Sequence, residues 1–461
     1  MSAARWRRRA LLKAGALAVG ASLLPPARSR AQEIGDVMDA LSRYMAAARE
    51  RALPEQVVEH VKHHVLDTLA AMVSGTELKP GQAALRFAAT QTHGGAATVI
   101  GADFTLDAGA AALVNGTCAH ADETDDSHGP SQSHPGASVV AAALALGESR
   151  GIDGARFMRA VALGYDVGPR VTMALGGVEF RNETRRSTHA FAGTFGASAA
   201  AACAAGLDAR QMRWLLDYAS QQAAGYAVWG RDTEHVEKAF VFGGMPARAG
   251  VTAAELVAAG WSGVDDVFSG EDNFFAVNAP NGDPGVLVAE LGARYEVGNT
   301  DIKKWSVGTP IQAPLDALEA LRKQRPFRAA DVTEVVVRLA PTVGAVVDNR
   351  DIPDICLQHM VAVMLLDGTA SFAAAHDAAR MQDAAVLRER AKVRYVPDAQ
   401  LAALLPARVA VVEVALRDGT RINERVEAVR GTVRNPMSRE EVVAKARDLV
   451  EPVFGVATAG R

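Results

Sequence analysis

Cysteine is scarce in this chain. Only Cys118, Cys203 and Cys356 occur among 461 residues, widely separated and odd in number. This pattern excludes a dense disulfide framework and metal sites built from CxxC pairs. We therefore expect buried free thiols, with a single disulfide as the alternative.

Strong net charge and aromatic residues are also missing. The formal net charge is −4 and aromatic residues make up 5% of the chain. Without a basic stripe, no nucleic-acid partner is expected. The hydrophobic fraction of 49%, much of it in alanine-rich runs, instead predicts a helical globular protein. The length exceeds one ordinary core and favours two domains.

Several motifs that mark common enzyme classes are absent. The chain has no GxGxxG after an expected strand, no GxxxxGK[ST] and no GxSxG. These absences exclude the usual dinucleotide, P-loop and serine-hydrolase interpretations. We expect no cofactor.

The N-terminus carries a basic segment before a short apolar run, 5-RWRRRALLKAGALAVGASLL-24. Arg8-Arg9 begins a pattern close to the twin-arginine type, and small residues up to Ala31 suit cleavage. A permanent membrane helix needs about 20 apolar residues, so this run is too short to span a bilayer. We expect residues 1–31 to be a signal peptide, the mature protein to be periplasmic, and no permanent membrane span.

Hydrophobic periodicity divides the rest of the chain. Apolar residues recur every three or four positions from Val57 to Met72, which predicts an amphipathic helix ending at Gly75. The run 193–206 consists almost only of glycine, alanine and other small residues, which suits a helix at the centre of a tightly packed core. Strand signals appear later, in segments 332–341, 408–416 and 420–429, with Asp418-Gly419 as a hairpin turn.

The predicted fold class is therefore mainly α, with a large all-helical domain and a smaller α/β (α+β) domain. We place the helical domain at 33–298 and the smaller domain at 299–433. The last segment, 434–461, is expected to form a C-terminal helix that returns to the helical domain.

The segment 120-HADETDDSHGPSQSHPG-136 concentrates histidines and carboxylates between two expected helices. His134 begins the second helix, where the helix dipole favours a neutral imidazole that can act as a general base. Glu123, Asp125 and Asp126 can orient that imidazole or, if one is protonated, act as an acid. The alternative is a solvated acidic loop with a histidine at a helix start.

Further candidates lie elsewhere. His189 precedes the small-residue helix and Lys238 precedes a Gly-Gly turn. Lys303 and Lys304 lie where the expected helical domain meets the expected smaller domain. Pockets form at such seams, so these cations can bind an anionic substrate. The alternatives are a hydrogen-bonded structural histidine and solvated surface lysines.

Nitrogen and oxygen ligands for zinc or manganese are also present in the loop. The possible ligands are His120, Glu123, Asp125, Asp126, His128 and His134. Their spacing matches no ligand signature such as HExxH, and we predict no metal. A metal hydrolase remains an alternative, which elemental analysis would decide.

Taken in order, these motifs resemble the MmgE/PrpD family, which includes 2-methylcitrate dehydratase, cis-aconitate decarboxylase and iminodisuccinate epimerase. The resemblance covers nearly the whole chain after residue 31. The matching segments are 63-HHVLDTLAAMVSG-75, 114-VNGTCAHADETDDSHGPSQSHPG-136, 193-GTFGASAAA-201, 238-KAFVFGGMPARAG-250, 303-KKWSVGTPIQAPLDA-317 and 358-QHMVAVMLLDG-368.

The resemblance implies a homodimer and metal-free chemistry next to a carboxylate of a di- or tricarboxylate. Glu123 stands at the first aspartate of the family's DxDD run, Ser127 at its usual threonine, and His134 at its HP histidine. His189, Lys238 and Lys303 match a further histidine and the substrate-facing lysines. Gly308 and Gln312 depart from the pattern, because many relatives carry His or Arg there.

We therefore predict a carbon–oxygen lyase, a dehydratase acting by proton abstraction on an acid such as 2-methylcitrate. The predicted catalytic residues are His134, His189, Glu123, Asp126 and Lys238. The predicted substrate-binding residues are Ser127, Asp125, Lys303, Lys304 and Gln312. The alternatives are a decarboxylase or epimerase of the same family and, from another class, a non-catalytic periplasmic carboxylate-binding protein.

Overall fold

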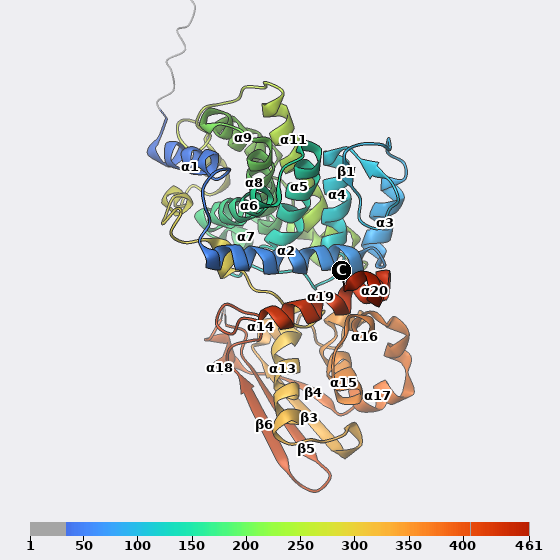
Figure 1. The fold of residues 1–461 in the computed structure, drawn as a ribbon. Helices are drawn as coiled ribbons and strands as arrows, with labels where there is room; N and C mark the ends of the chain where they lie inside the picture. The colour runs from blue at the N-terminus through green and yellow to red at the C-terminus, as the bar shows by residue number, and fades with distance from the viewer. Residues whose placement is uncertain (1–33, 406, 461) are drawn as a thin grey trace, which may run out of the picture. The chain divides into compact units, whose positions relative to one another are not determined.

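Helices dominate the described part of the chain, which is residues 34–405 and 407–460 of a computed structural model (Figure 1). The fold is mainly α with a small α/β portion, as predicted. The expected signal peptide, residues 1–31, lies outside the described residues. Among the described helices, none has the length and apolar composition that a membrane crossing requires.

The first part of the chain folds into packed α-helices and one small β-hairpin. Its helices are α1 Asp36–Ala47, α2 Glu55–Gly75, α3 Lys79–Ala88, α4 Ala108–Ala119, α5 Pro135–Arg150, α6 Gly154–Ala174, α7 Val178–Thr184, α8 Thr188–Ala205, α9 Ala209–Gln222, α10 Val236–Ala239, α11 Met245–Ala258 and α12 Phe274–Asn278. Strands β1 Ala97–Thr98 and β2 Thr105–Leu106 pair in antiparallel fashion. Short turns of 3-10 or π helix complete it, namely η1 Ala227–Arg231, η2 Phe240–Gly244, η3 Pro284–Leu287 and η4 Glu296–Asn299.

Helix α8 lies at the centre of this part, as its small residues predict. It is buried from Thr188 to Ala204 and packs against α5, α6 and α11. Close backbone approach requires glycine here, because a Cβ on Gly168 would lie 2.4 Å from the carbonyl oxygen of Ala192. The helix begins at Thr188, earlier than expected, so His189 lies inside its first turn.

The second part of the chain contains a four-stranded sheet of order β4-β3-β5-β6. Its strands are β3 Val332–Leu339, β4 Val393–Pro397, β5 Ala410–Leu416 and β6 Arg421–Val426, and only the β3–β4 pairing is parallel. The accompanying helices are α13 Thr309–Gln324, α14 Pro341–Gly344, α15 Leu357–Asp367, α16 Phe372–His376, α17 Ala384–Arg390 and α18 Ala399–Ala402, with η5 Ala329–Asp331, η6 Pro353–Ile355 and η7 Ala378–Gln382. Helix α13 packs on β5 and β6 (Figure 1).

The hairpin at Asp418-Gly419 forms as predicted, with β5 and β6 antiparallel. One detail differs from expectation: strand β4 was not foreseen, because its five residues are mostly half-buried or exposed and give little periodicity. Helix α16 ends at His376, and Asp377 starts η7 by accepting a hydrogen bond from the Arg380 amide.

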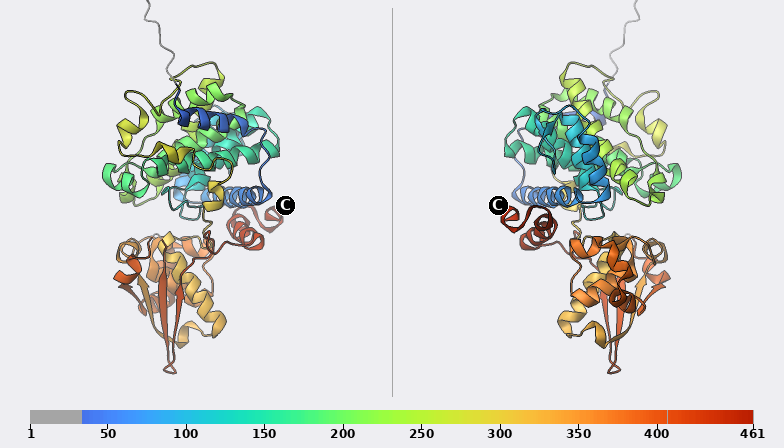
Figure 2. Two further views of the ribbon diagram at one scale, coloured as in Figure 1. Left: turned by 90° about the vertical axis from the view of Figure 1, so that its left-hand side faces the viewer. Right: turned by 90° about the vertical axis from the view of Figure 1, so that its right-hand side faces the viewer.

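The C-terminal helices, α19 Arg439–Phe454 and α20 Val456–Ala459, follow the sheet. Helix α19 lies along α2 (Figures 1 and 2). Ser438 and Glu441 form the capping box that starts α19. A buried Lys445 on α19 reaches Asp67 on α2, with 2.6 Å between Nζ and Oδ1.

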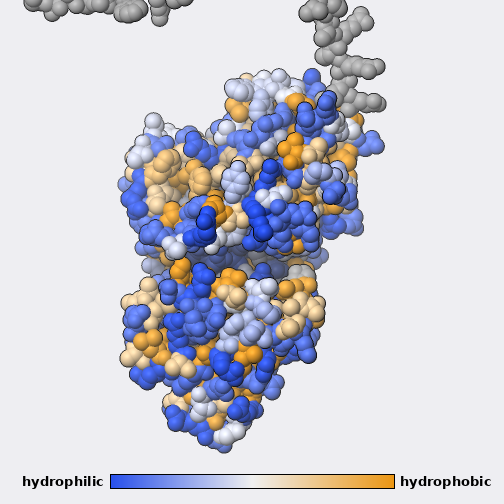
Figure 3. Space-filling view, turned by 180° about the vertical axis from the view of Figure 1, so that it is seen from behind, coloured by the Kyte–Doolittle hydropathy of each residue, from blue (hydrophilic) through white to orange (hydrophobic). Residues whose placement is uncertain are grey.

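Two large hydrophobic clusters form, one from residues between 38 and 297 and one from residues between 305 and 429. In the space-filling view the surface is hollowed between the helical and sheet-containing regions (Figure 3). The segment 298–304 connects the two clusters and carries Lys303. Cys118, Cys203 and Cys356 are buried and free, as predicted.

Candidate active site

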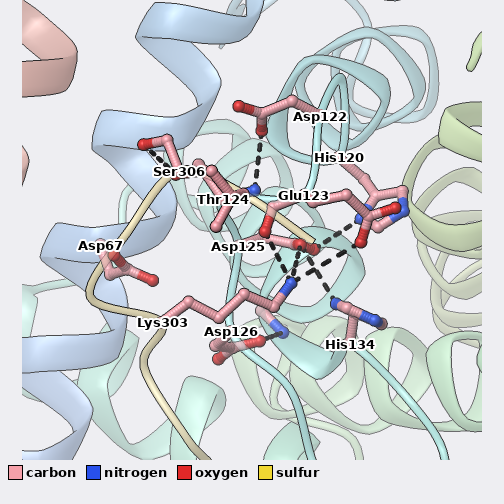
Figure 4. Close-up of polar contacts among 12 residues, drawn as sticks. Asp67, His120, Asp122, Glu123, Thr124, Asp125, Asp126, His134, Lys303 and Ser306 are labelled. Carbon is pink, nitrogen blue, oxygen red and sulfur yellow. Dashed lines mark hydrogen bonds and ion pairs between the residues drawn. The ribbon is translucent and has the colours of Figure 1, made fainter. Parts of the chain in front are cut away.

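The histidine and carboxylate loop lies between α4 and α5 and is buried, not solvated (Figure 4). Its backbone is fixed at several points. Ser127 and Asp301 exchange two backbone hydrogen bonds, of 2.9 and 2.8 Å. Thr124 donates from its hydroxyl to Ser306 at 2.8 Å. The alternative interpretation of a solvated acidic loop is therefore wrong.

Asp125 is the hub of the site. One carboxylate oxygen lies 2.8 Å from Nδ1 of His120, and the other lies 3.1 Å from Nδ1 of His134 and 3.5 Å from Nζ of Lys303. Burial alone raises the pKa of Asp125, but His120, His134 and Lys303 outweigh it and hold the pKa well below its usual value. An ionised carboxylate can only accept hydrogen bonds, so both imidazoles carry their proton on Nδ1.

Glu123 connects the two predicted lysines. Lys238 forms a close ion pair with its carboxylate, and Lys303 donates to its backbone oxygen at 2.7 Å. The Lys303 ammonium lies 3.9 Å from the other carboxylate oxygen. Burial raises the pKa of Glu123, but Lys238 and Lys303 outweigh it and leave it well below its usual value. Glu123 is thus a carboxylate that positions ammonium groups, and not a proton donor.

His134 and His189 lie together, with ring centroids 5.1 Å apart. Burial lowers the pKa of His134, and Lys303 adds to this effect while Asp125 opposes it. Burial, followed by the neighbouring histidines and Lys238, lowers the pKa of His189 well below its usual value. Both imidazoles are neutral near physiological pH. With Nδ1 of His134 bound to Asp125, its Nε2 lone pair is free to accept a proton.

Asp126 has a different environment from Asp125. It accepts hydrogen bonds from the Tyr165 hydroxyl at 2.5 Å and the Gly136 amide at 3.0 Å, and it contacts Nδ1 of His64 at 2.8 Å. These partners use its oxygens within the protein. Asp126 therefore anchors the loop to α2, α5 and α6, a positioning role where the sequence predicted a catalytic one.

A cavity of about 780 Å³ opens beside the loop. Of the predicted residues, Ser127, His134, His189, Lys303 and Gln312 line it. The other predicted residues, Glu123, Asp125, Asp126, Lys238 and Lys304, do not line it. The cavity extends from the histidines to Arg408 before β5 and to the loop 427–434.

Two side chains that were predicted to bind substrate instead make hydrogen bonds within the protein. Lys304 donates to Glu319 at 2.7 Å, and its ammonium lies 4.4 Å from the Trp305 ring centroid. The Gln312 amide accepts from the Trp305 amide at 3.1 Å and donates to the carbonyl oxygens of Trp305 and Val307. Gln312 thus holds the start of α13 beside the cavity without a free amide hydrogen for a ligand.

Metal ligands could also come together here. The side-chain atoms of His120, Asp125 and His134, and those of His120, Glu123 and His235, lie within 4.8 Å of one another. The Nε2 atoms of His120 and His235 are buried without a hydrogen-bond partner among the described residues. Both carboxylates, however, are already paired with lysine ammonium groups, which compete with a cation. That no metal is required stays a prediction.

Several supporting residues were not foreseen. His64 and Tyr165 hold Asp126 from positions 62 and 39 residues away, and Lys445 donates to the Thr124 carbonyl oxygen across 321 residues. No local spacing links such partners. The only signal was the unusual presence of a His-His pair at 63–64 on a helix that otherwise looks amphipathic.

Comparison with known proteins gives a consistent family match. The model of the MmgE/PrpD N-terminal domain matches residues 39–286, and that of the C-terminal domain matches residues 305–461. The cis-aconitate decarboxylase of Homo sapiens is 27% identical over 419 residues, covering 86% of this chain and 84% of that protein. The cis-aconitate decarboxylase of Aspergillus terreus is 24% identical over 433 residues, covering 87% and 86%. A cis-aconitate decarboxylase-like protein, oryM, of Aspergillus oryzae is 26% identical over 332 residues, covering 68% of each.

Proposed function

Because this chain belongs to the MmgE/PrpD family, a family of enzymes, we propose that it is a lyase acting on a di- or tricarboxylate through a carbanion next to a carboxylate. The first candidate reaction is dehydration of a hydroxy acid such as 2-methylcitrate. The observation that carries the proposal is the pairing of a neutral imidazole and an ammonium group on one cavity wall, His134 and Lys303.

Asp125 prepares both groups for this chemistry. It fixes the Nδ1 tautomer of His134 at 3.1 Å, and it lies 3.5 Å from the Lys303 ammonium. Nε2 of His134 then removes the proton on the carbon beside the carboxylate. The negative charge that develops on that carboxylate is stabilised by Lys303, because a fixed, buried cation interacts more strongly with it than a cation in water does.

In this elimination His134 serves as both the base and the acid, so no second residue is needed to move the proton. The C–H electron pair forms the C=C bond while the C–O bond to the hydroxyl breaks. His134, protonated in the first step, returns its proton to the departing hydroxide, and water leaves. The imidazole is neutral again at the end of the cycle, which its lowered pKa favours.

Decarboxylation is the second candidate, since the named relatives are cis-aconitate decarboxylases. In that reaction a C–C bond breaks, carbon dioxide leaves, and the resulting carbanion takes a proton that His134 has first taken up from solvent. The same imidazole and the same ammonium group serve both reactions. The products, water with an alkene or carbon dioxide, distinguish them.

The test compares the wild-type protein with His134→Asn on 2-methylcitrate, citrate and cis-aconitate. Alkene formation is followed by ultraviolet absorbance, carbon dioxide by its release, and C–H exchange by mass spectrometry in D₂O. We expect turnover of at least one acid by the wild type and a loss of about 10²-fold or more in His134→Asn, the usual contribution of a general base. The exposed-loop variant His93→Asn is the matched control and should keep full activity.

Turnover by His134→Asn within a fewfold of the wild type would contradict the assignment of the base. An acid that binds tightly to the wild type, with neither product nor exchange of any C–H, would favour the non-catalytic carboxylate-binding protein.

We also propose that residues 1–31 direct export to the periplasm and that the mature protein is a homodimer. The support for export is the basic segment and short apolar run described above, and the support for a dimer is the family resemblance. Cell fractionation of a strain with Arg8 and Arg9 replaced by lysine tests the first proposal. Sedimentation equilibrium of the mature protein tests the second.

A further inference from the structure

The cavity has a wall far from the histidines that the proposed chemistry does not use. It consists of Arg408, just before β5, and of the loop 427–434. A di- or tricarboxylate that places one carboxylate against Lys303 has at least one more carboxylate to accommodate. The cation that meets this second carboxylate determines which acids bind.

The start of α13 cannot supply that cation. Thr309 and Gln312 line the cavity there, and neither carries a charge. Gly308, immediately before, has no side chain, and the Gln312 amide is occupied by the backbone of Trp305 and Val307.

Two other arginines of the cavity wall are already paired. Arg294 donates to Glu290 at 2.7 Å and to Glu296 at 2.9 Å. Arg430 donates to Glu441 at 3.0 Å and to Asn435 at 2.7 Å. Carboxylates hold these guanidinium groups by hydrogen bonds of 2.7–3.0 Å, whereas the carboxylate oxygens nearest Lys303 Nζ lie 3.5 and 3.9 Å away, so the two arginines have few free donors for a substrate carboxylate.

Arg408 differs from them. Its side chain makes no hydrogen bond or salt bridge with any described residue, although the negative charges of Asp301 and Glu123 act on it. The guanidinium therefore belongs to the electrostatic environment of the catalytic loop while its five N–H donors remain available. Arg434 on the same wall is exposed, as Arg408 is, and a variant of each arginine distinguishes the two.

We propose that Arg408 binds a second carboxylate of the substrate, remote from the reacting carbon, and thereby selects acids with at least two carboxylates over monocarboxylates. This inference rests on the proposed function, since it places the first carboxylate at Lys303. A guanidinium binds a carboxylate with paired, charge-assisted hydrogen bonds, which makes it selective for geometry as well as charge.

The test measures binding by titration calorimetry with two acids of equal chain length that differ by one carboxylate, pentanedioate and pentanoate. The wild type should bind the dicarboxylate about ten-fold or more tightly than the monocarboxylate. Arg408→Met should lose most of this difference while its affinity for pentanoate changes little. Arg408→Lys should keep the charge and part of the difference, which separates carboxylate binding from a structural role.

Arg421→Met, on the exposed β6, is the matched control and should bind as the wild type does. The assignment is overturned if Arg408→Met retains the wild-type preference for the dicarboxylate, or if Arg434→Met abolishes that preference instead. Because binding is measured without turnover, these outcomes leave the proposed lyase intact. A wild-type protein that binds neither acid overturns the carboxylate-directed function itself, and this inference with it.

Discussion

Replacing Asp125 with asparagine isolates the contribution of the hub carboxylate to catalysis. Asp125 accepts from His120 at 2.8 Å and from His134 at 3.1 Å, and it faces the Lys303 ammonium at 3.5 Å. Asparagine offers one acceptor oxygen and two N–H groups. It can therefore satisfy Nδ1–H of only one imidazole, and it removes the negative charge from a fully buried position.

The size of the effect follows from these contacts. A hydrogen bond to a charged group contributes about 1.5–3 kcal/mol, which corresponds to roughly 10- to 100-fold in rate. If the N–H groups of asparagine also stabilise the wrong tautomer of His134, the loss rises toward about 10⁴-fold, as for the equivalent change in serine proteases. We expect Asp125→Asn to lower kcat within this range.

The pH dependence gives a second, independent readout. A general base works when neutral, so activity falls as the pH decreases through the pKa of His134. Asp125 raises that pKa, against the lowering effect of burial. Removal of its charge should therefore shift the acid limb of kcat/KM to lower pH, measured on any acid that the wild type converts.

Asp126→Asn is the matched control, one residue along the chain. Its partners are Tyr165 and His64, so it should lower stability and leave the acid limb where it is. The reasoning is refuted if Asp125→Asn stays within a fewfold of the wild type, if its acid limb moves to higher pH, or if Asp126→Asn reproduces its pH profile.

Two more predictions concern contacts around the loop. Lys445→Met removes the ion pair with Asp67 and the hydrogen bond to the Thr124 carbonyl oxygen. It should lower the free energy of unfolding, measured in urea, by about 3–5 kcal/mol. A decrease below about 1 kcal/mol would show that the ion pair does not stabilise the fold. Burial lowers the pKa of His376, but Asp122, 3.0 Å away, outweighs it and raises the pKa to about 9. This contribution to stability is present below about pH 6.5 and is lost as the pH rises through 9, amounting to at most about 3 kcal/mol. His376→Gln should flatten the stability curve in that window, and a curve identical to that of the wild type would exclude the pair as its cause.

The fold was predictable where one kind of residue dominates a segment. The small residues of 193–206 allow backbones to approach closely, and this property alone places α8 at the centre of the helices. The alternation and the Asp418-Gly419 turn likewise determine β5 and β6. Strand β4 was not predicted because it is held by parallel pairing with β3. That pairing joins residues about 58 positions apart, and no local sequence pattern indicates it.

The site was predictable in its composition and less so in its geometry. Sequence placed His134 and Asp125 in one loop; their side chains lie 3.1 Å apart, and of the two His134 lines the cavity. It could not distinguish Asp125 from Asp126, because adjacent carboxylates in a loop are equivalent until their partners are known. Those partners come from α2 and α6, and they hold Asp126 inside the protein.

The segment 298–304, which connects the two hydrophobic clusters, brings Lys303 to the loop between α4 and α5. Lys303 lies between the two hydrophobic clusters, and the backbone beside it is tied on both sides: Asp301 exchanges two hydrogen bonds with Ser127, and the Ile302 amide donates to Gly431 at 3.0 Å. Rotation of the sheet-containing part at this point would break these bonds and withdraw the Lys303 ammonium from Asp125. These bonds therefore hold the Lys303 ammonium and the loop together before substrate arrives. Any movement that admits the substrate has to occur in the wall around Arg408, because the loop 427–434 is itself bonded to Ile302 and Asp301 through Gly431 and Val433.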